Sequence, residues 1–185
     1  TTIMKKALLS LGLLCGIMMS CVQKTQIEPA IPYDVELEQK VEKTLKGMTL
    51  EEKIGQMTQL SLEVFGKRGT QEDSFVFDEA KIDTAIYKYK IGSILNVPGV
   101  AVKPEKWFEI ISQVQQKSME SMGIPCIYGL DMNHGASYVQ GATFFPQNIN
   151  LAATYNRDIA RRAGEITAYE PRASNRPWPF CPVVD

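Results

Sequence analysis

The sequence predicts an α/β fold built on a parallel sheet, with about three strands and intervening helices. Apolar residues recur at the helical period in some segments and form short continuous runs in others, which is typical of alternating helices and strands. The expected strands cover 91–97, 126–131 and 178–184, and a helical pattern lies between each neighbouring pair. Strand, helix, strand, helix, strand is the order in which a (β/α)8 barrel begins.

Residues 1–20 have the features of a secretory signal peptide. A charged start at 4–6 precedes an apolar stretch at 7–19. That stretch of about thirteen residues is shorter than the roughly 20 that span a bilayer. Ser20 places a small residue before Cys21, the arrangement at which lipoprotein signal peptidases cut, so Cys21 is the predicted lipidation site. An ordinary cleaved signal or a short anchor is the alternative.

Residues 21–32 are expected to form a lipidated tether ahead of a domain at 33–185. They contain few large apolar residues and include Pro29 and Pro32. Multiply acylated lipoproteins carry more than one lipid chain, which stable membrane anchoring requires. We therefore expect an exported bacterial lipoprotein in the periplasm or outer membrane, with the membrane as a partner.

Charge and cysteine content argue against several classes of partner and cofactor. The chain has 20 basic and 21 acidic residues and shows no basic stripe, so no nucleic-acid partner is predicted. Cys15 would leave with the signal peptide, and Cys126 and Cys181 are expected in buried strands, where cysteine behaves as a small apolar residue. One histidine and two scattered cysteines do not supply the usual ligands of zinc, so no metal and no other cofactor is predicted. Nothing in the composition predicts the oligomeric state.

Three helices are expected before the first strand. Asp34 is expected to cap one that ends at Gly47. Thr49 and Glu52 form a capping box that opens the next, and Asp78 opens the third. Their expected inward residues are Leu37, Val41, Leu45, Leu50, Ile54, Met57, Ile82, Ala85, Ile86 and Tyr89.

Two further helices separate the strands. Pro104 is expected to start one that Gly123 stops, and Asn156 is expected to cap the other. Pro171 falls inside this last helix, where proline costs ~3 kcal/mol or more. Arg176 puts a charge just ahead of the third strand. The expected inward residues are Trp107, Ile110, Ile111, Val114, Ile159, Ala163 and Ile166.

The stretch 124–135, Ile-Pro-Cys-Ile-Tyr-Gly-Leu-Asp-Met-Asn-His-Gly, joins a short apolar run to a polar loop. A buried parallel strand of this kind delivers Asp131 to the carboxyl edge of the sheet, where ligands bind in such folds. The stretch resembles the YGxDxxHG signature of family 3 glycoside hydrolases of the two-domain β-glucosidase type. The resemblance continues at 48–57, 141–146, 151–154 and 170–173.

The resemblance implies a (β/α)8 TIM-like barrel, of which 33–185 would be the truncated N-terminal part. Such a barrel takes about 250 residues, so an incomplete one is expected from 185 residues. The family pattern would continue after Asp185 into an Arg-Asp-Pro-Arg-Trp-Gly segment. A piece of a barrel leaves an unpaired edge and is expected to fold poorly alone. The residues that depart from the family pattern are Pro171, Arg176, Pro179 and Cys181.

Individual residues have expected roles, of which that of Asp131 is implied by the resemblance. Asp131 would bind hydroxyls of the sugar at the cleavage subsite, because an ionised carboxylate can accept two donors at once. His134, the only histidine, is expected to shape the loop after the strand, with ligand contact as the alternative. Glu170 and Arg172 are expected to tie a helix end to neighbouring loops. Trp107 and Trp178 are expected in the core, although Trp178 could instead contact sugar.

The activity that the resemblance implies is hydrolysis of terminal non-reducing β-D-glucosyl residues from oligosaccharides by a retaining mechanism. A β-linked oligosaccharide is the expected substrate. The nucleophile and the acid/base are expected outside this chain, so no catalytic residue is assigned here, and the fragment is expected to be inactive alone. The alternatives are a β-xylosidase of the same family and a non-catalytic sugar-binding surface lipoprotein.

Overall fold

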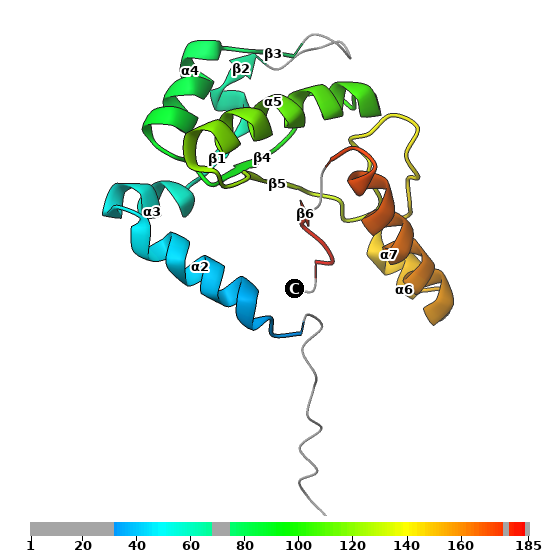
Figure 1. Cartoon of the computed structure of the whole chain (residues 1–185). Coiled ribbons are helices and arrows are strands. Elements are labelled where there is room, and N and C mark those ends of the chain that lie inside the picture. The colour runs from blue at the N-terminus through cyan, green and yellow to red at the C-terminus, as the bar shows by residue number, and fades with distance from the viewer. Residues whose placement is uncertain (1–31, 68–74, 176–177, 184–185) are drawn as a thin grey trace, which may run out of the picture. The chain divides into compact units, whose positions relative to one another are not determined.

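The computed structural model describes residues 32–67, 75–175 and 178–183 (Figure 1). The expected signal peptide, Cys21 and most of the tether therefore lie outside the described residues. The chain divides into two units, 1–44 and 45–185. Within the described residues, none of the helices has both the length and the apolar character that a membrane span needs.

Helix α2 (Val35–Gly47) begins as predicted, at a cap made by Asp34. One carboxylate oxygen of Asp34 accepts hydrogen bonds from the backbone N–H groups of Glu36 and Leu37, at 3.0 and 3.1 Å. The helix buries no residue. The prediction of an inward-facing apolar stripe is wrong for this helix, because the stripe is exposed along its length: Leu37, Val41 and Leu45.

In the described part of the chain, the sheet contains four parallel strands in the order β1 (Gln59–Ser61), β4 (Ser93–Leu95), β5 (Ile127–Leu130) and β6 (Trp178–Pro179). The predicted α/β class and parallel sheet are confirmed. Strand β1 was not predicted, because it is short and Leu60 is its only large apolar residue. Two-residue strands β2 (Gly66–Lys67) and β3 (Val76–Phe77) form a separate antiparallel pair.

Helix α3 (Leu50–Gln56) has the predicted capping box. The backbone N–H of Glu52 donates to the Thr49 hydroxyl at 3.2 Å, and the N–H of Thr49 donates to the Glu52 carboxylate at 2.9 Å. The inward face was predicted wrongly, since the helix approaches its neighbours through Gly55. A Cβ there would lie 2.1 Å from the Tyr89 carbonyl oxygen. The three expected core residues are exposed: Leu50, Ile54 and Met57.

Helix α4 (Glu79–Asp83) continues into a π-helical turn, η2 (Thr84–Lys88), and buries most of the predicted residues. Asp78 caps it by accepting the Lys81 N–H at 3.3 Å. Tyr89, expected inward, is 57% exposed. The wider π turn shifts the helical phase of residues that follow it, which explains the error. The buried residues are Ile82, Ala85 and Ile86.

Helix α5 (Pro104–Met122) covers one face of the sheet and ends at Gly123 in the left-handed conformation, φ 66°. The Trp107 ring meets that of Tyr128 on β5 edge-on, with centroids 5.9 Å apart. Side chains alternate along a strand, so Leu60, Ile94 and Tyr128 share this helix-covered face by register. All four expected inward residues of α5 are buried: Trp107, Ile110, Ile111 and Val114.

The C-terminal part holds α6 (Asn148–Ala152), which was not predicted, and α7 (Arg157–Arg172). Asn156 caps α7 as expected, since its side-chain oxygen accepts two backbone N–H groups. Strand β6 is shorter than the predicted 178–184, because Pro179 and Pro182 have no N–H for a strand ladder. Of the expected inward residues of α7, Ala163 is buried, Ile166 is half-buried and Ile159 is exposed.

Candidate functional site

Asp131 directly follows β5 and therefore lies at the carboxyl edge of the sheet, as predicted. By strand alternation it continues the face that carries Ile127 and Gly129, opposite the face covered by α5. Ile127 on that face is 52% exposed, and Asp131 is exposed as well. The carboxylate of Asp131 is thus open to a ligand at the edge of the sheet.

Asn96 ends the neighbouring strand β4 with a left-handed backbone, φ 77°. Its carbonyl oxygen accepts the hydroxyl of Tyr128 at 2.5 Å, on the helix-covered side. Its side-chain amide donates to the hydroxyl of Ser61 at 3.0 Å. Three adjacent strands therefore present polar groups at one edge, from Ser61, Asn96 and Asp131.

Ser61 and Asn96 were missed as site residues for different reasons. Ser61 ends a strand that was not predicted, and Asn96 fell inside the expected strand 91–97. The available signal was an asparagine directly before Val97, Pro98 and Gly99. Asparagine adopts the left-handed conformation more readily than most residues and often ends regular structure there.

The loop after Asp131 packs against a second loop at 141–145. The backbone N–H of Phe145 donates to the carbonyl of His134 at 2.8 Å. The rings of His134 and Phe144 meet edge-on at 4.7 Å between centroids. Gly135 has φ 102°, and a Cβ on it would lie 2.1 Å from the Thr143 carbonyl oxygen. These contacts support the loop-shaping role expected for His134.

Glu170 near the end of α7 holds the same loop. Its carboxylate accepts the backbone N–H of Thr143 at 2.9 and 3.2 Å and the Thr143 hydroxyl at 2.7 Å. The prediction that Glu170 ties a helix end to a neighbouring loop is confirmed. Arg172, expected to do the same, is exposed.

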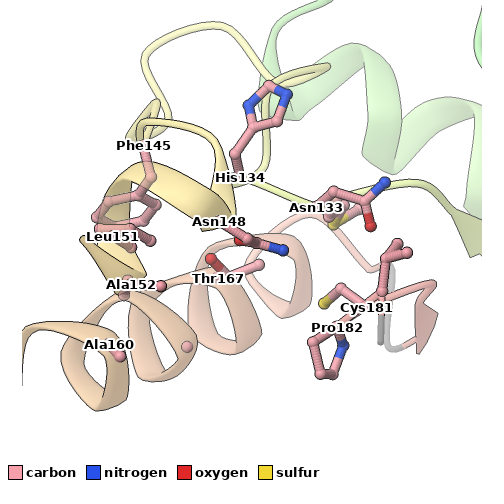
Figure 2. Close-up of a pocket in the computed structure, with 14 residues that line it drawn as sticks. Asn133, His134, Phe145, Asn148, Leu151, Ala152, Ala160, Thr167, Cys181 and Pro182 are labelled. Atoms are coloured by element: carbon pink, nitrogen blue, oxygen red, sulfur yellow. The ribbon is translucent and has the colours of Figure 1, made fainter. Parts of the chain in front are cut away.

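A cavity of about 380 Å³ lies between α6, α7, the loop at 132–134 and the segment 181–183 (Figure 2). Most of its lining is apolar or small, including Leu151 and Ala163. Two of the lining residues carry buried polar atoms without a hydrogen-bond partner among the described residues, Asn133 Oδ1 and His134 Nδ1. Asp131 is not among the residues that line this cavity, so the edge site and the cavity are separate features.

The remaining candidates for chemistry are the tryptophans and the free thiols. Trp107 is fully buried, as predicted, whereas Trp178 on β6 is 43% exposed and packs edge-on against Phe180. Burial raises the pKa of the Cys126 thiol to about 12, so this residue is protonated at neutral pH. Burial also raises the pKa of Cys181, which is half-buried and lies outside any strand, contrary to the prediction.

Comparison with known proteins gives one family. Residues 49–185 match the N-terminal domain of glycosyl hydrolase family 3. The sequence is 38% identical to a lysosomal β-glucosidase of Dictyostelium discoideum over 78% of this chain and 18% of that protein. It is 28% identical to a periplasmic β-glucosidase of Salmonella typhimurium over 76% of this chain and 16% of that protein.

Solved structures agree with the sequence comparison. An exo-1,3/1,4-β-glucanase from a Pseudoalteromonas species superposes with a TM-score of 0.69 at 28% identity, covering 85% of this chain and 19% of that one. A β-glucosidase from Listeria innocua in complex with glucose gives a TM-score of 0.58 at 25% identity, covering 80% and 19%. The chain thus spans less than a fifth of the length of these relatives, and its parallel α/β fold matches part of theirs.

Proposed function

The chain belongs to glycosyl hydrolase family 3, and from this we propose that it is the N-terminal part of an exported β-glucosidase. The full-length enzyme would release terminal non-reducing β-D-glucosyl residues from oligosaccharides. The observation that carries the proposal is the exposed Asp131 carboxylate at the carboxyl edge of β5, inside the YGxDxxHG motif. Relatives described as β-glucosidases support the choice of sugar.

Asp131 would act by binding rather than by bond-breaking. Its carboxylate offers two oxygens that accept hydrogen bonds from neighbouring hydroxyls of the terminal sugar. Hydrogen bonds of this kind in glycosidases strengthen as the sugar distorts towards the oxocarbenium-like transition state. Asp131 would thereby hold the ring in position while other groups carry out the reaction.

The proposed reaction is retaining hydrolysis. One carboxylate attacks the anomeric carbon while a carboxylic acid protonates the leaving oxygen, and water then hydrolyses the glycosyl-enzyme. Neither carboxylate is assigned to this chain; both would come from the rest of the full-length protein. Residues 22–185 expressed alone should therefore show no turnover of an aryl β-glucoside.

The direct test is an assay of the full-length protein with 4-nitrophenyl β-D-glucoside and β-D-xyloside, with the anomer of the first product followed by NMR. A higher kcat/KM for the glucoside and a β-configured first product are expected. Preference for the xyloside would favour a β-xylosidase. Binding of glucose without turnover of either substrate would favour a sugar-binding lipoprotein.

We also propose that the protein is anchored by lipid at Cys21. The proposal rests on the small residue Ser20 before Cys21 and on the apolar stretch that precedes them. Cells fed labelled palmitate should label the wild-type protein and not the Cys21→Ser variant, and only the wild type should enter a detergent phase. Equal labelling and equal partitioning of both proteins would exclude Cys21 as the anchor.

A further inference from the structure

We propose that Asn96 is a second sugar-hydroxyl contact, placed beside Asp131 and held in position by Ser61 and Tyr128. This inference rests on the proposed function, because it adds a residue to the site that Asp131 would form. It concerns substrate recognition and assigns Asn96 no part in breaking the glycosidic bond.

Asn96 lies next to Asp131 along the carboxyl edge of the sheet. Leu95 on β4 is paired with Gly129 on β5 in parallel register. Asn96 directly follows Leu95, and Asp131 is the second residue after Gly129. Both therefore lie at the carboxyl ends of adjacent strands. Adjacent strands are ~4.8 Å apart, a spacing that two hydroxyls of one sugar ring can bridge.

The Asn96 side chain does not follow the regular alternation of the strand. Regular strand alternation would turn it to the same face as Ile94, which is fully buried against the helices. The left-handed backbone breaks that alternation, and the amide nitrogen lies 3.0 Å from the Ser61 hydroxyl. Ser61 is paired with Leu95 and shares its face, which is the face that Asp131 continues. The amide is therefore turned towards the open face.

The Asn96 amide has hydrogen-bonding groups that its bond to Ser61 does not use. An asparagine side chain carries two N–H donors and one carbonyl acceptor. Among the described residues, its side chain uses one N–H, in the bond to Ser61. Asn96 is half-buried, and its Oδ1 is not among the buried atoms that lack a partner. A donor and an acceptor thus remain for hydroxyl groups, next to a carboxylate that can only accept.

The backbone of Asn96 is held by a contact with the core. The Tyr128 hydroxyl donates to the Asn96 carbonyl from the helix-covered side, and the Tyr128 ring packs on Trp107. The Tyr128 bond holds the left-handed backbone of Asn96, φ 77°, in place. The core therefore fixes the backbone while the side chain points the other way.

The test uses Asn96→Gly in the full-length enzyme, because glycine accepts φ 77° and the variant removes only the side chain. We expect kcat/KM on an aryl β-glucoside to fall about tenfold with no loss of melting temperature, which corresponds to one or two neutral hydrogen bonds. Asn175→Gly is the matched control, since Asn175 is also left-handed, φ 61°, and exposed after α7. It should leave kcat/KM unchanged.

Aryl glucosides that each lack one hydroxyl distinguish a direct contact of Asn96 with the sugar from a purely structural role of Asn96. If Asn96 binds one hydroxyl, the substrate that lacks it should be hydrolysed equally well by wild type and Asn96→Gly, while the other deoxy substrates keep the difference. If Asn96→Gly lowers kcat/KM by the same factor for every substrate, the proposed contact between Asn96 and a sugar hydroxyl is wrong. If Asn96→Gly is as active as wild type while Asp131→Ala is impaired, this inference alone fails. If Asp131→Ala is also unimpaired, or wild type is inactive, the proposed function fails with it.

Discussion

The Glu170 carboxylate and Thr143 form three hydrogen bonds that join α7 to the loop at 141–145. In the same loop, the backbone N–H of Phe145 donates a hydrogen bond to the carbonyl of His134. The segment that follows Asp131 is thus held by a chain of contacts that ends on α7. Loss of any one of these contacts should loosen the loop next to the proposed sugar site.

Glu170→Ala is expected to destabilise the protein by about 1–2 kcal/mol, because a hydrogen-bonded charged group is lost at a partly exposed position. Amide exchange at 141–145 should accelerate, and the urea unfolding midpoint should fall. Glu165→Ala is the control, since among the described residues Glu165 makes only an exposed i,i+3 pair with Arg162, and its loss should change stability by less than about 0.5 kcal/mol. Equal effects of the two variants would mean that Glu170 does not hold the loop.

Gly135→Ala is expected to damage the loop severely. A methyl group there would lie 2.1 Å from the Thr143 carbonyl oxygen, and the residue has φ 102°. Gly141→Ala separates the two causes, because Gly141 has φ 78° but an added Cβ would have no atom of the described residues within 4 Å. It should show the cost of the backbone conformation alone, of order 1–2 kcal/mol. If the two variants have the same melting temperature, the close approach to Thr143 is not the reason that position 135 requires glycine.

The sequence predicted the core helices well because their signals are local. The stripe of Trp107, Ile110, Ile111 and Val114 is buried as expected, and the caps at Thr49 and Asn156 form. Amphipathic period and capping chemistry act within a few residues, so they can be recognised without tertiary structure.

The errors occurred where contacts between distant segments decide the outcome. Strand β1 exists because Gln59 and Ser61 pair with β4, 34 residues further along the chain, and not because of an apolar run. Helix α3 approaches its neighbours through Gly55, which a hydrophobic pattern does not mark. The pairing of Asn96 with Ser61 likewise depends on the sheet order, so Asp131 was identified from its motif and Asn96 was not.

The Cys126 thiol is expected to resist alkylation in the folded protein. Burial raises its pKa from 9.0 to about 12, so the reactive thiolate is scarce at neutral pH. Iodoacetamide followed by peptide mass spectrometry should label Cys126 only in denaturant, and the half-buried Cys181 should react sooner. Rapid labelling of native protein at Cys126 would contradict its burial.

The same shift gives a pH dependence of stability. The folded pKa lies above the unfolded value, so the contribution of Cys126 is fully present below about pH 9 and is lost as pH rises towards 12. Cys126→Ala should remove this dependence. The difference in unfolding free energy between wild type and variant should therefore be constant from pH 6 to 8 and shrink above about pH 9.

The most direct test of the sugar site is kcat/KM of full-length Asp131→Ala on an aryl β-glucoside. Two hydrogen bonds to a charged group contribute roughly 1.5–3 kcal/mol each, so a fall on the order of 10²-fold or more is expected. Asp158→Ala, at the exposed start of α7, should keep wild-type kcat/KM. His134→Ala should mainly lower the melting temperature. Near-wild-type kcat/KM for Asp131→Ala, together with a lowered melting temperature, would contradict the account and make Asp131 a structural loop residue.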